Sequence, residues 1–341
     1  MTNNERRGFI TGGTWCVDTN RIVSHWPEED GLAEYLGEER GNGGSGSNFA
    51  LDIKQLDPAM PVETITMVGD DEDGRFLAAI ADRAGIGRAQ MHVAPKIRTQ
   101  ATDAFVARDT HRRTHIFNRG ASSLLTPDHF DFASTRARIL HLGLPGVHQL
   151  MDQPWGEDAN GWVTVLKKAH AAGLRTNLEL ASVGNDVIAA LVPPCLPHLD
   201  TIIVNDAEIG ALSGLVTVTA GVTDVSACQR AARIVLEKGV KEIVVVHCPA
   251  LAIAVDRHGQ SVIKPSVNVP AAEIAGANGA GDAFASGMMF GQHEGWSIEA
   301  SLTLAHATAA ASLRGFATTG AIEPWRDCLA LANRWGWRGA P

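Results

Sequence analysis

The sequence predicts an α/β fold in which helices cover both faces of a mostly parallel sheet. The chain has 341 residues, of which 45% are hydrophobic and 20% are charged, a composition typical of globular proteins. From residue 137 onwards, short apolar runs alternate with amphipathic stretches of helical length. This order favours parallel strands, because each helix returns the chain to the same edge of the sheet. No linker or repeat interrupts the pattern, so we expect a single α/β domain over residues 1–341.

The spacing of apolar residues predicts the elements in chain order. Short apolar runs or strict alternation predict strands, and apolar residues three or four apart predict helices. In the first part we expect a buried strand at 8–17, a helix at 49–56, a strand at 62–68, a helix after residue 74 and hairpin strands within 99–121. In the second part we expect strands at 138–142, 174–178, 202–204 and 242–246, with an apolar run at 251–255 that pairs with the last strand or follows it. Helices are expected at 162–172, 186–192, 227–238 and 302–313, with an amphipathic closing helix near the C-terminus.

Charge and cysteine content restrict the possible partners and location. The formal net charge is −9, which disfavours nucleic acid and anionic membranes as partners. The five cysteines form no Cys-x-x-Cys pair, so neither a zinc site nor a disulfide framework is expected. No apolar run reaches membrane-spanning length, and no apolar signal core follows the polar N-terminus. We therefore expect a cytoplasmic protein.

A glycine-rich turn at 276–282 is the central functional motif. Its sequence, Gly-Ala-Asn-Gly-Ala-Gly-Asp, leads into a helix-like run that begins near Asp282. Glycines allow a tight turn and close approach to a ligand, and a helix that starts there directs free N–H groups at an anion. An aspartate on the first turn can then act as a general base beside a bound phosphate. The alternative is that Asp282 is an ordinary helix N-cap after a glycine loop.

A second glycine-rich segment at 41–46 matches the dinucleotide-binding pattern Gly-x-Gly-x-x-Gly. The match is weak, because Glu38-Glu39-Arg40 precedes it instead of a buried strand, and we reject that interpretation. Asn48 follows shortly after. Its amide can both donate and accept hydrogen bonds, which suits a ligand with hydroxyl groups, although it could equally cap the helix at 49–56.

Both glycine-rich segments resemble the signatures of one enzyme family. Gly-Ala-Asn-Gly-Ala-Gly-Asp-Ala-Phe resembles the C-terminal signature of the ribokinase-like (PfkB) carbohydrate kinases, and Gly43-Gly44 with Asn48 resembles their N-terminal signature. The resemblance implies an ATP-dependent kinase with Mg²⁺, in which Gly279, Ala280 and Gly281 form the anion hole and Asp282 is the base. It also implies a ribokinase-like fold with a small β lid, built here from roughly 15–40 and 97–120, and relatives often dimerise through this lid.

The same resemblance assigns further roles, each with a structural alternative. Asp18, Gly43, Gly44 and Asn48 would bind acceptor hydroxyls, although Asp18 could simply be a turn residue. Arg119 resembles a position that holds a carboxylate in some sugar-acid kinases, and the alternative is a surface arginine. Asn205 and Glu208 would orient phosphate oxygens and Mg²⁺ through water, although the pair also fits a capping box. Asn278 and His306 would contribute to the nucleotide site, and His306 could equally serve helix packing.

Two segments differ from the usual family pattern. Gly276-Ala277 replaces an Asp-Thr whose aspartate often helps to hold a monovalent cation in relatives, so potassium activation is not expected. The segment 247–250, His-Cys-Pro-Ala, lacks both glycines of a Thr-x-Gly-x-x-Gly turn that touches the nucleotide in relatives. Proline there also removes a backbone donor. The nucleotide contacts of this chain are therefore expected to differ from those of relatives.

The sequence thus predicts an ATP-dependent kinase that phosphorylates a hydroxyl of a sugar or a sugar acid. A nucleoside kinase of the same family is the nearest alternative, favoured by Asn278 and disfavoured by the few aromatic residues around the expected acceptor site. A non-catalytic sugar-binding protein of the same fold is the third. The differences at 247–250 and 276–277 support it, and the intact Asp282 opposes it.

Overall fold

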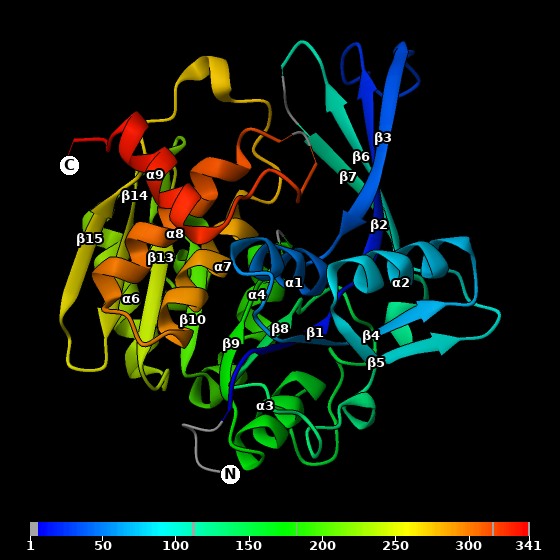
Figure 1. The fold of residues 1–341 in the computed structure, drawn as a ribbon, viewed down its shortest axis with the longest axis horizontal. Helices are drawn as coiled ribbons and strands as arrows, with labels where there is room; N and C mark the ends of the chain where they lie inside the picture. Colours follow the sequence, from blue (N-terminus) through cyan, green and yellow to red (C-terminus); the bar gives the residue numbers. More distant parts are fainter. Residues whose placement is uncertain (1–5, 111–112, 182, 316, 340–341) are drawn as a thin grey trace.

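The computed structural model describes residues 6–110, 113–181, 183–315 and 317–339. Within them, helices cover both faces of a large sheet, and a small sheet projects from one side (Figure 1). The large sheet has the strand order β15-β14-β13-β10-β9-β8-β1-β4-β5. Its strands are β1 (Phe9–Gly13), β4 (Val62–Gly69), β5 (Gly87–Ala94), β8 (Ile139–Gly143), β9 (Arg175–Leu178), β10 (Thr201–Asn205), β13 (Ile243–His247), β14 (Leu251–Asp256) and β15 (Ser261–Pro265).

In this spatial order, the neighbouring strands from β13 through β10, β9, β8, β1 and β4 to β5 all pair in parallel. At the other edge, β14 and β15 are added by antiparallel pairing. The helices between them are α1 (Ser45–Leu56), α2 (Glu72–Ala84), α3 (Gly161–Ala171), α4 (Asn185–Leu191), α5 (Asp206–Ser213), α6 (Val225–Glu237), α7 (Ala280–His293), α8 (Ile298–Ser312) and α9 (Trp325–Trp335). The predicted α/β class with a mostly parallel sheet is confirmed.

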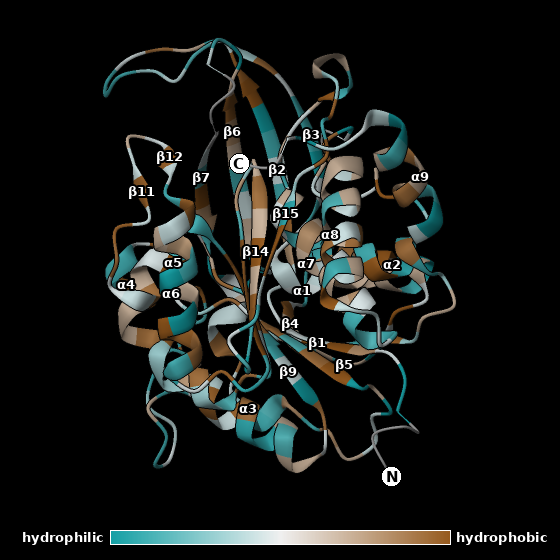
Figure 2. Cartoon of the chain, turned by 90° about the vertical axis from the view of Figure 1, so that its left-hand side faces the viewer, coloured by the Kyte–Doolittle hydropathy of each residue, from teal (hydrophilic) through white to brown (hydrophobic). Residues whose placement is uncertain are grey.

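Two hydrophobic cores lie on the two faces of the large sheet. Because successive strand residues point to opposite faces, Ile202 and Val204 pack with α3 to α6, whereas Ile203 packs with α1, α2, α7, α8 and α9. Figure 2 shows the same arrangement edge-on, with helices on both sides of the sheet. Sheets covered on both faces need apolar residues at nearly every position, which explains the continuous apolar runs of the central strands.

The small sheet has the strand order β3-β2-β6-β7. Its strands are β2 (Cys16–Val23), β3 (Tyr35–Gly43), β6 (Ala101–Ala107) and β7 (Arg113–Asn118). β2 and β6 pair in parallel, and the outer pairs are antiparallel. Figure 1 shows this sheet beside the N-terminal end of α1.

The structure corrects several predicted boundaries. The single strand predicted at 8–17 is two strands, because the chain leaves the large sheet after Gly13 and enters the small one at Cys16. The helix predicted from 302 starts at Ile298, where Ser297 caps it by accepting from the N–H of Ala300. The run at 251–255 pairs antiparallel with β13.

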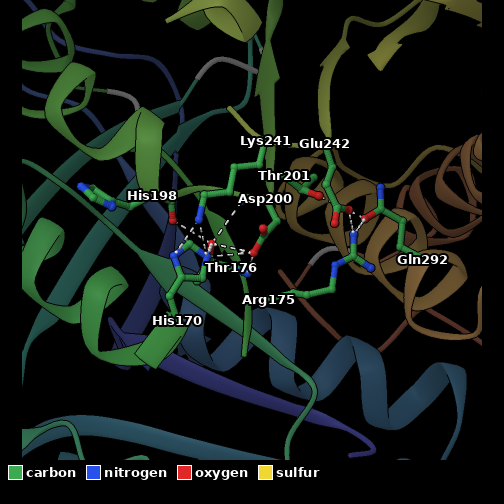
Figure 3. A network of polar contacts seen from close by, with 9 residues as sticks. All are labelled: His170, Arg175, Thr176, His198, Asp200, Thr201, Lys241, Glu242 and Gln292. Atoms are coloured by element: carbon green, nitrogen blue, oxygen red, sulfur yellow. Dashed lines mark hydrogen bonds and ion pairs between the residues drawn. The ribbon is translucent and has the colours of Figure 1, made fainter. Parts of the chain in front are cut away.

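At the amino ends of β9, β10 and β13 a polar network ties the strand starts together (Figure 3). Asp200 accepts from the N–H of Thr176 (2.8 Å) and from Nε2 of His170 (3.0 Å), and Lys241 Nζ donates to the other ring nitrogen of His170. Arg175 and Glu242 form an ion pair nearby. Among the described residues, no helix is long and apolar enough to cross a membrane.

Candidate functional site

A cavity of about 410 Å³ opens where several parallel strands of the large sheet end. Its floor includes residues at or just beyond the carboxyl ends of five strands: Thr14, Leu144, Glu179, Asn205 and His247. The small sheet contributes further lining residues: Cys16, Asp18, Thr102, His115 and Phe117. In open α/β sheets, ligands bind outside the carboxyl ends of the strands, so this cavity is the natural ligand site.

The N-terminus of α7 forms one wall of the cavity. Gly279 precedes the helix with φ +74°, and a Cβ at this position would lie 2.2 Å from the carbonyl oxygen of Thr318. Only glycine fits such a place without strain. Among the residues that the structure describes, no side chain caps α7, so the N–H groups of its first turn are available to an anion in the cavity.

Asp282 lies on this first turn and lines the cavity. Asn48 Nδ2 donates to its Oδ2 at 3.1 Å. Enclosure by protein atoms raises the pKa of Asp282 well above its ordinary value, and the negative charge of Glu179 raises it further. Deprotonated Asp282 is therefore a stronger base than an exposed aspartate.

A chain of hydrogen bonds orients the Asn48 amide. Asn42 Nδ2 donates to Asn48 Oδ1 at 2.9 Å, which leaves the Asn48 Nδ2 directed at Asp282. Asn42 is held in turn by the loop after α8, because the Thr318 hydroxyl donates to its backbone carbonyl (2.8 Å) and the Thr319 hydroxyl to its side-chain oxygen (3.1 Å). The Asp282 carboxyl group is thus held by segments from both ends of the chain.

Asp18 and Gly44 line the cavity, whereas Gly43 is not a lining residue and packs against Asp18. A Cβ at Gly43 would fall within 2.0–2.3 Å of the Asp18 carboxylate, so the glycine makes room for that side chain. Gly44 precedes α1 with φ +88°. Burial raises the pKa of Asp18, and the Cys16 thiol donates to its Oδ1 at 3.3 Å.

Asn205 and Glu208 form a full capping box at the start of α5 and also line the cavity. The Asn205 side chain accepts from the N–H groups of Ala207 and Glu208, and Glu208 Oε2 accepts from the Asn205 N–H at 2.9 Å. Burial raises the pKa of Glu208 to about 7. The capping box is therefore present, and its position at the cavity is compatible with the expected role toward phosphate and Mg²⁺.

These features agree with the comparison to known proteins. The family model described as pfkB family carbohydrate kinase matches residues 14–326. The chain belongs to the pfkB carbohydrate kinase family. This membership confirms the predicted family and enzyme class, a phosphotransferase with a hydroxyl acceptor.

Among proteins similar to this pfkB family member, adenosine kinase of Saccharomyces cerevisiae is 27% identical over 278 residues, which cover 80% of this chain and 77% of the relative. The ribokinase structure of Thermotoga maritima has a TM-score of 0.77 at 19% identity, covering 96% of this chain and 99% of that one. Arabidopsis thaliana ribokinase complexed with ribose and ATP has a TM-score of 0.76 at 19% identity, with the same coverage.

The structure brings most of the predicted site residues of this pfkB kinase together. Ten of them line the cavity: Asp18, Gly44, Asn48, Asn205, Glu208, Asn278, Gly279, Ala280, Gly281 and Asp282. Arg119 is not among the lining residues, because its guanidinium group donates to the carbonyl oxygen of Val147 at 3.2 Å. His306 is buried on α8, where it donates to the Lys264 carbonyl at 3.0 Å and packs edge-on against Phe284. The structure does not place either residue in the cavity.

Several lining residues were not predicted. Glu179 belongs to no local motif, but it directly follows the buried strand β9, and Asn205 is likewise the last residue of β10. A polar residue at the end of a predicted buried strand is therefore the sequence feature that could have identified Glu179. His247, noted only as part of an unusual turn, packs against Phe284, and a Cβ at Gly281 would lie 3.8 Å from its ring. Burial lowers the pKa of His247 to about 4, so the ring is neutral.

Proposed function

We propose that this kinase transfers the γ-phosphate of ATP to a hydroxyl group of a sugar or sugar acid, with Asp282 as general base. The observation that carries the proposal is the position of Asp282 on the first turn of α7, facing the cavity and held by Asn48. Phosphoryl transfer depends mainly on a well-positioned acceptor and on hydrogen-bond donors that stabilise the developing negative charge, and little on covalent chemistry by the protein. The N–H groups of Gly279, Ala280 and Gly281 would supply those donors.

The chain's own residues divide the reaction between them. Asp18 and Asn48 hold acceptor hydroxyls on one side of the cavity, and the start of α7 receives the phosphate on the other. As the acceptor oxygen attacks phosphorus, Asp282 takes its proton. The small sheet, which lines the acceptor side, acts as a lid that excludes water and so prevents hydrolysis of ATP.

Magnesium fits the donor set at the cavity. Asn205 and Glu208 provide hard oxygen atoms beside the proposed phosphate position. A nearby cation would stabilise the ionised form of the buried Glu208 carboxyl group, whose pKa burial raises. Mg²⁺ bound with ATP would neutralise charge on the phosphates, held by these two residues through water. Asn278 borders the same region and is proposed as a nucleotide contact.

A nucleoside acceptor is the second candidate. Phe117, Leu144 and Val147 line the acceptor side and offer an apolar surface on which a base could lie. The similarity to an adenosine kinase supports this candidate. Arg119 lies beside the same surface, 5.6 Å from the Phe117 ring, and would have to leave the Val147 carbonyl to hold a sugar-acid carboxylate.

Association and location are also part of the proposal. Ile116 on the small sheet is 57% exposed, which suits a homodimer formed through the lid. The five cysteines are all free, in keeping with a cytoplasmic location.

The test is ADP release from MgATP with a panel of sugars, sugar acids and nucleosides. Turnover with one class is expected, and Asp282→Asn should reduce it by several orders of magnitude while the fold is kept. Undiminished turnover in Asp282→Asn would refute the assignment of the base. Stabilisation by a sugar without stabilisation by ATP and without ADP release would identify a binding protein instead.

A further inference from the structure

A second carboxyl group lies against the proposed base. Glu179 and Asp282 line the same cavity, and their carboxyl groups lie within hydrogen-bonding reach of each other. An ionised carboxylate can only accept hydrogen bonds, so a hydrogen bond between them requires a proton on one of the two groups. Two carboxylates in contact also repel each other strongly, which opposes ionisation of both. The pair therefore retains a proton that an isolated aspartate would lose at neutral pH.

Both carboxyl groups receive a hydrogen bond, but the donor to Glu179 is closer, at 2.7 Å, than the Asn48 amide is to Asp282, at 3.1 Å, so the charge is favoured on Glu179. Asn177 Nδ2 donates to His141 Nδ1 at 2.9 Å, so the proton of that ring lies on Nε2, which donates to Glu179 Oε2 at 2.7 Å. The His141 ring is completely buried and stacks on Phe49 with ring centroids 3.8 Å apart. Burial lowers the pKa of His141 to about 3, so the ring remains a neutral donor. A donated hydrogen bond favours the ionised form of Glu179.

The remaining groups around the pair add negative charge or none. Asn48 from α1 donates to Asp282, and Asp52, one turn later on the same helix, is fully buried, where burial and the charges of Asp282 and Glu179 raise its pKa. The other titratable groups that line the cavity near the pair are Cys16 and Asp18 from β2, His115 from β7, Glu208 from α5 and His247 from β13. In the described part of the chain, neither lysine nor arginine lines the cavity. His247 is neutral, and His115 interacts with Asp18 rather than with the pair.

We propose that Glu179 and Asp282 share one proton in the ligand-free enzyme, carried by Asp282, and that Glu179 is a positioning residue that sets the pH at which Asp282 becomes a base. The inference rests on the proposed kinase function. Loss of the shared proton to solvent leaves both groups ionised. The Asp282 carboxylate then accepts the proton of the acceptor hydroxyl while the O–P bond forms and the bond to ADP breaks. One proton thus leaves before each turnover and one is taken up during it.

The first experiment is the pH profile of kcat/KM for the acceptor at saturating MgATP. Glu179→Gln keeps an acceptor for His141 and a donor for Asp282 but removes the charge. We expect the acid limb of the profile to move to lower pH by about one unit or more. Glu242→Gln is the matched control, because Glu242 belongs to the polar network of Figure 3, at the amino ends of the strands, whereas Glu179 follows the carboxyl end of β9. Its neutralisation should leave the acid limb in place. An unmoved limb in Glu179→Gln overturns the proposal.

A metal-binding role for Glu179 predicts a different result. In that case Glu179→Gln would raise the Mg²⁺ concentration needed for half-maximal activity and leave the acid limb unmoved, as a cation-holding residue should. That outcome also overturns the proposal. Glu208→Gln provides the reference, since its expected effect is on the Mg²⁺ dependence.

A second measurement does not depend on turnover or on the folding of a Glu179 variant. The infrared carbonyl band of a protonated carboxyl group is recorded for ligand-free wild type and Asp282→Asn at neutral pH. Because the charge of Asp282 also raises the pKa of Asp52, the same pair of spectra is recorded in an Asp52→Asn background, where the difference isolates Glu179 and Asp282. We expect one protonated carboxyl to be lost in Asp282→Asn, and an unchanged band overturns the proposal. If no acceptor is phosphorylated, the proposed function fails, and this spectrum still decides the proton sharing.

Discussion

Replacing Gly279 by alanine tests how far the stability of the fold depends on the turn before α7. Gly279 has φ +74°, a conformation that costs a residue with a Cβ about 1–2 kcal/mol. The new Cβ would also lie 2.2 Å from the Thr318 carbonyl oxygen, which is backbone and must move. We therefore expect a total penalty of about 2–3 kcal/mol in the free energy of unfolding.

The expected change in melting temperature follows from the size of the chain. With an unfolding entropy of about 2.1 cal/mol/K per residue, 341 residues give about 0.7 kcal/mol/K, so Gly279→Ala should lower the Tm by about 3–4 °C. Gly281→Ala is the matched control, because it is helical and its Cβ would meet only His247, at 3.8 Å. Alanine should raise the Tm there by about 1 °C, since it gains about 0.5–1 kcal/mol over glycine within a helix. Calorimetry that finds equal shifts in the two variants would refute the reasoning.

Two further predictions concern buried polar groups. The pKa of Glu208 is raised to about 7, so its proton stabilises the folded state below pH 4.5 and that contribution is lost as the pH rises through about 7. Without divalent cations, the free energy of unfolding of the wild type, measured by thermal unfolding, should fall by up to about 3 kcal/mol over this pH range, and that of Glu208→Gln should not show this fall. Equal pH dependence of the unfolding free energy in the two proteins would contradict the prediction. Trp162→Phe removes the hydrogen bond from Nε1 to Asp152 (2.8 Å) and should lower unfolding stability in denaturant by about 1–3 kcal/mol. Trp26→Phe, at a side chain that is 49% exposed, should change it little, and similar losses in both variants would contradict the argument.

The sequence was sufficient for features with a local cause. The turn at 276–282 and the capping box at 205–208 depend on glycines, an asparagine and a glutamate within one or two turns of chain, and both form as expected. The central strands were predictable because they are buried on both faces and read as continuous apolar runs. The edge strands β5 and β15 were missed, since they are half exposed and carry mixed residues.

Features that depend on distant contacts were not predictable from local patterns. Arg119 was expected to hold a ligand, but its orientation depends on the carbonyl of Val147, 28 residues along the chain. The position of Glu179 directly after a buried strand could have placed it at the cavity, but its proximity to His141 and Asp282 appears only when β8, β9 and α7 come together. Side-chain direction at a single position is set by packing, which a single sequence does not contain.

The bond between the Thr318 hydroxyl and the Asn42 carbonyl spans 276 residues, and this has a consequence for biosynthesis. The cavity needs strand ends near residue 13 and a loop near residue 318, which at about 5–20 residues per second leave the ribosome roughly 15–60 s apart. A nascent chain can therefore fold much of its first helices and strands and still lack the turn before α7. Incomplete chains should be catalytically silent, because the cavity is complete only after synthesis is essentially finished.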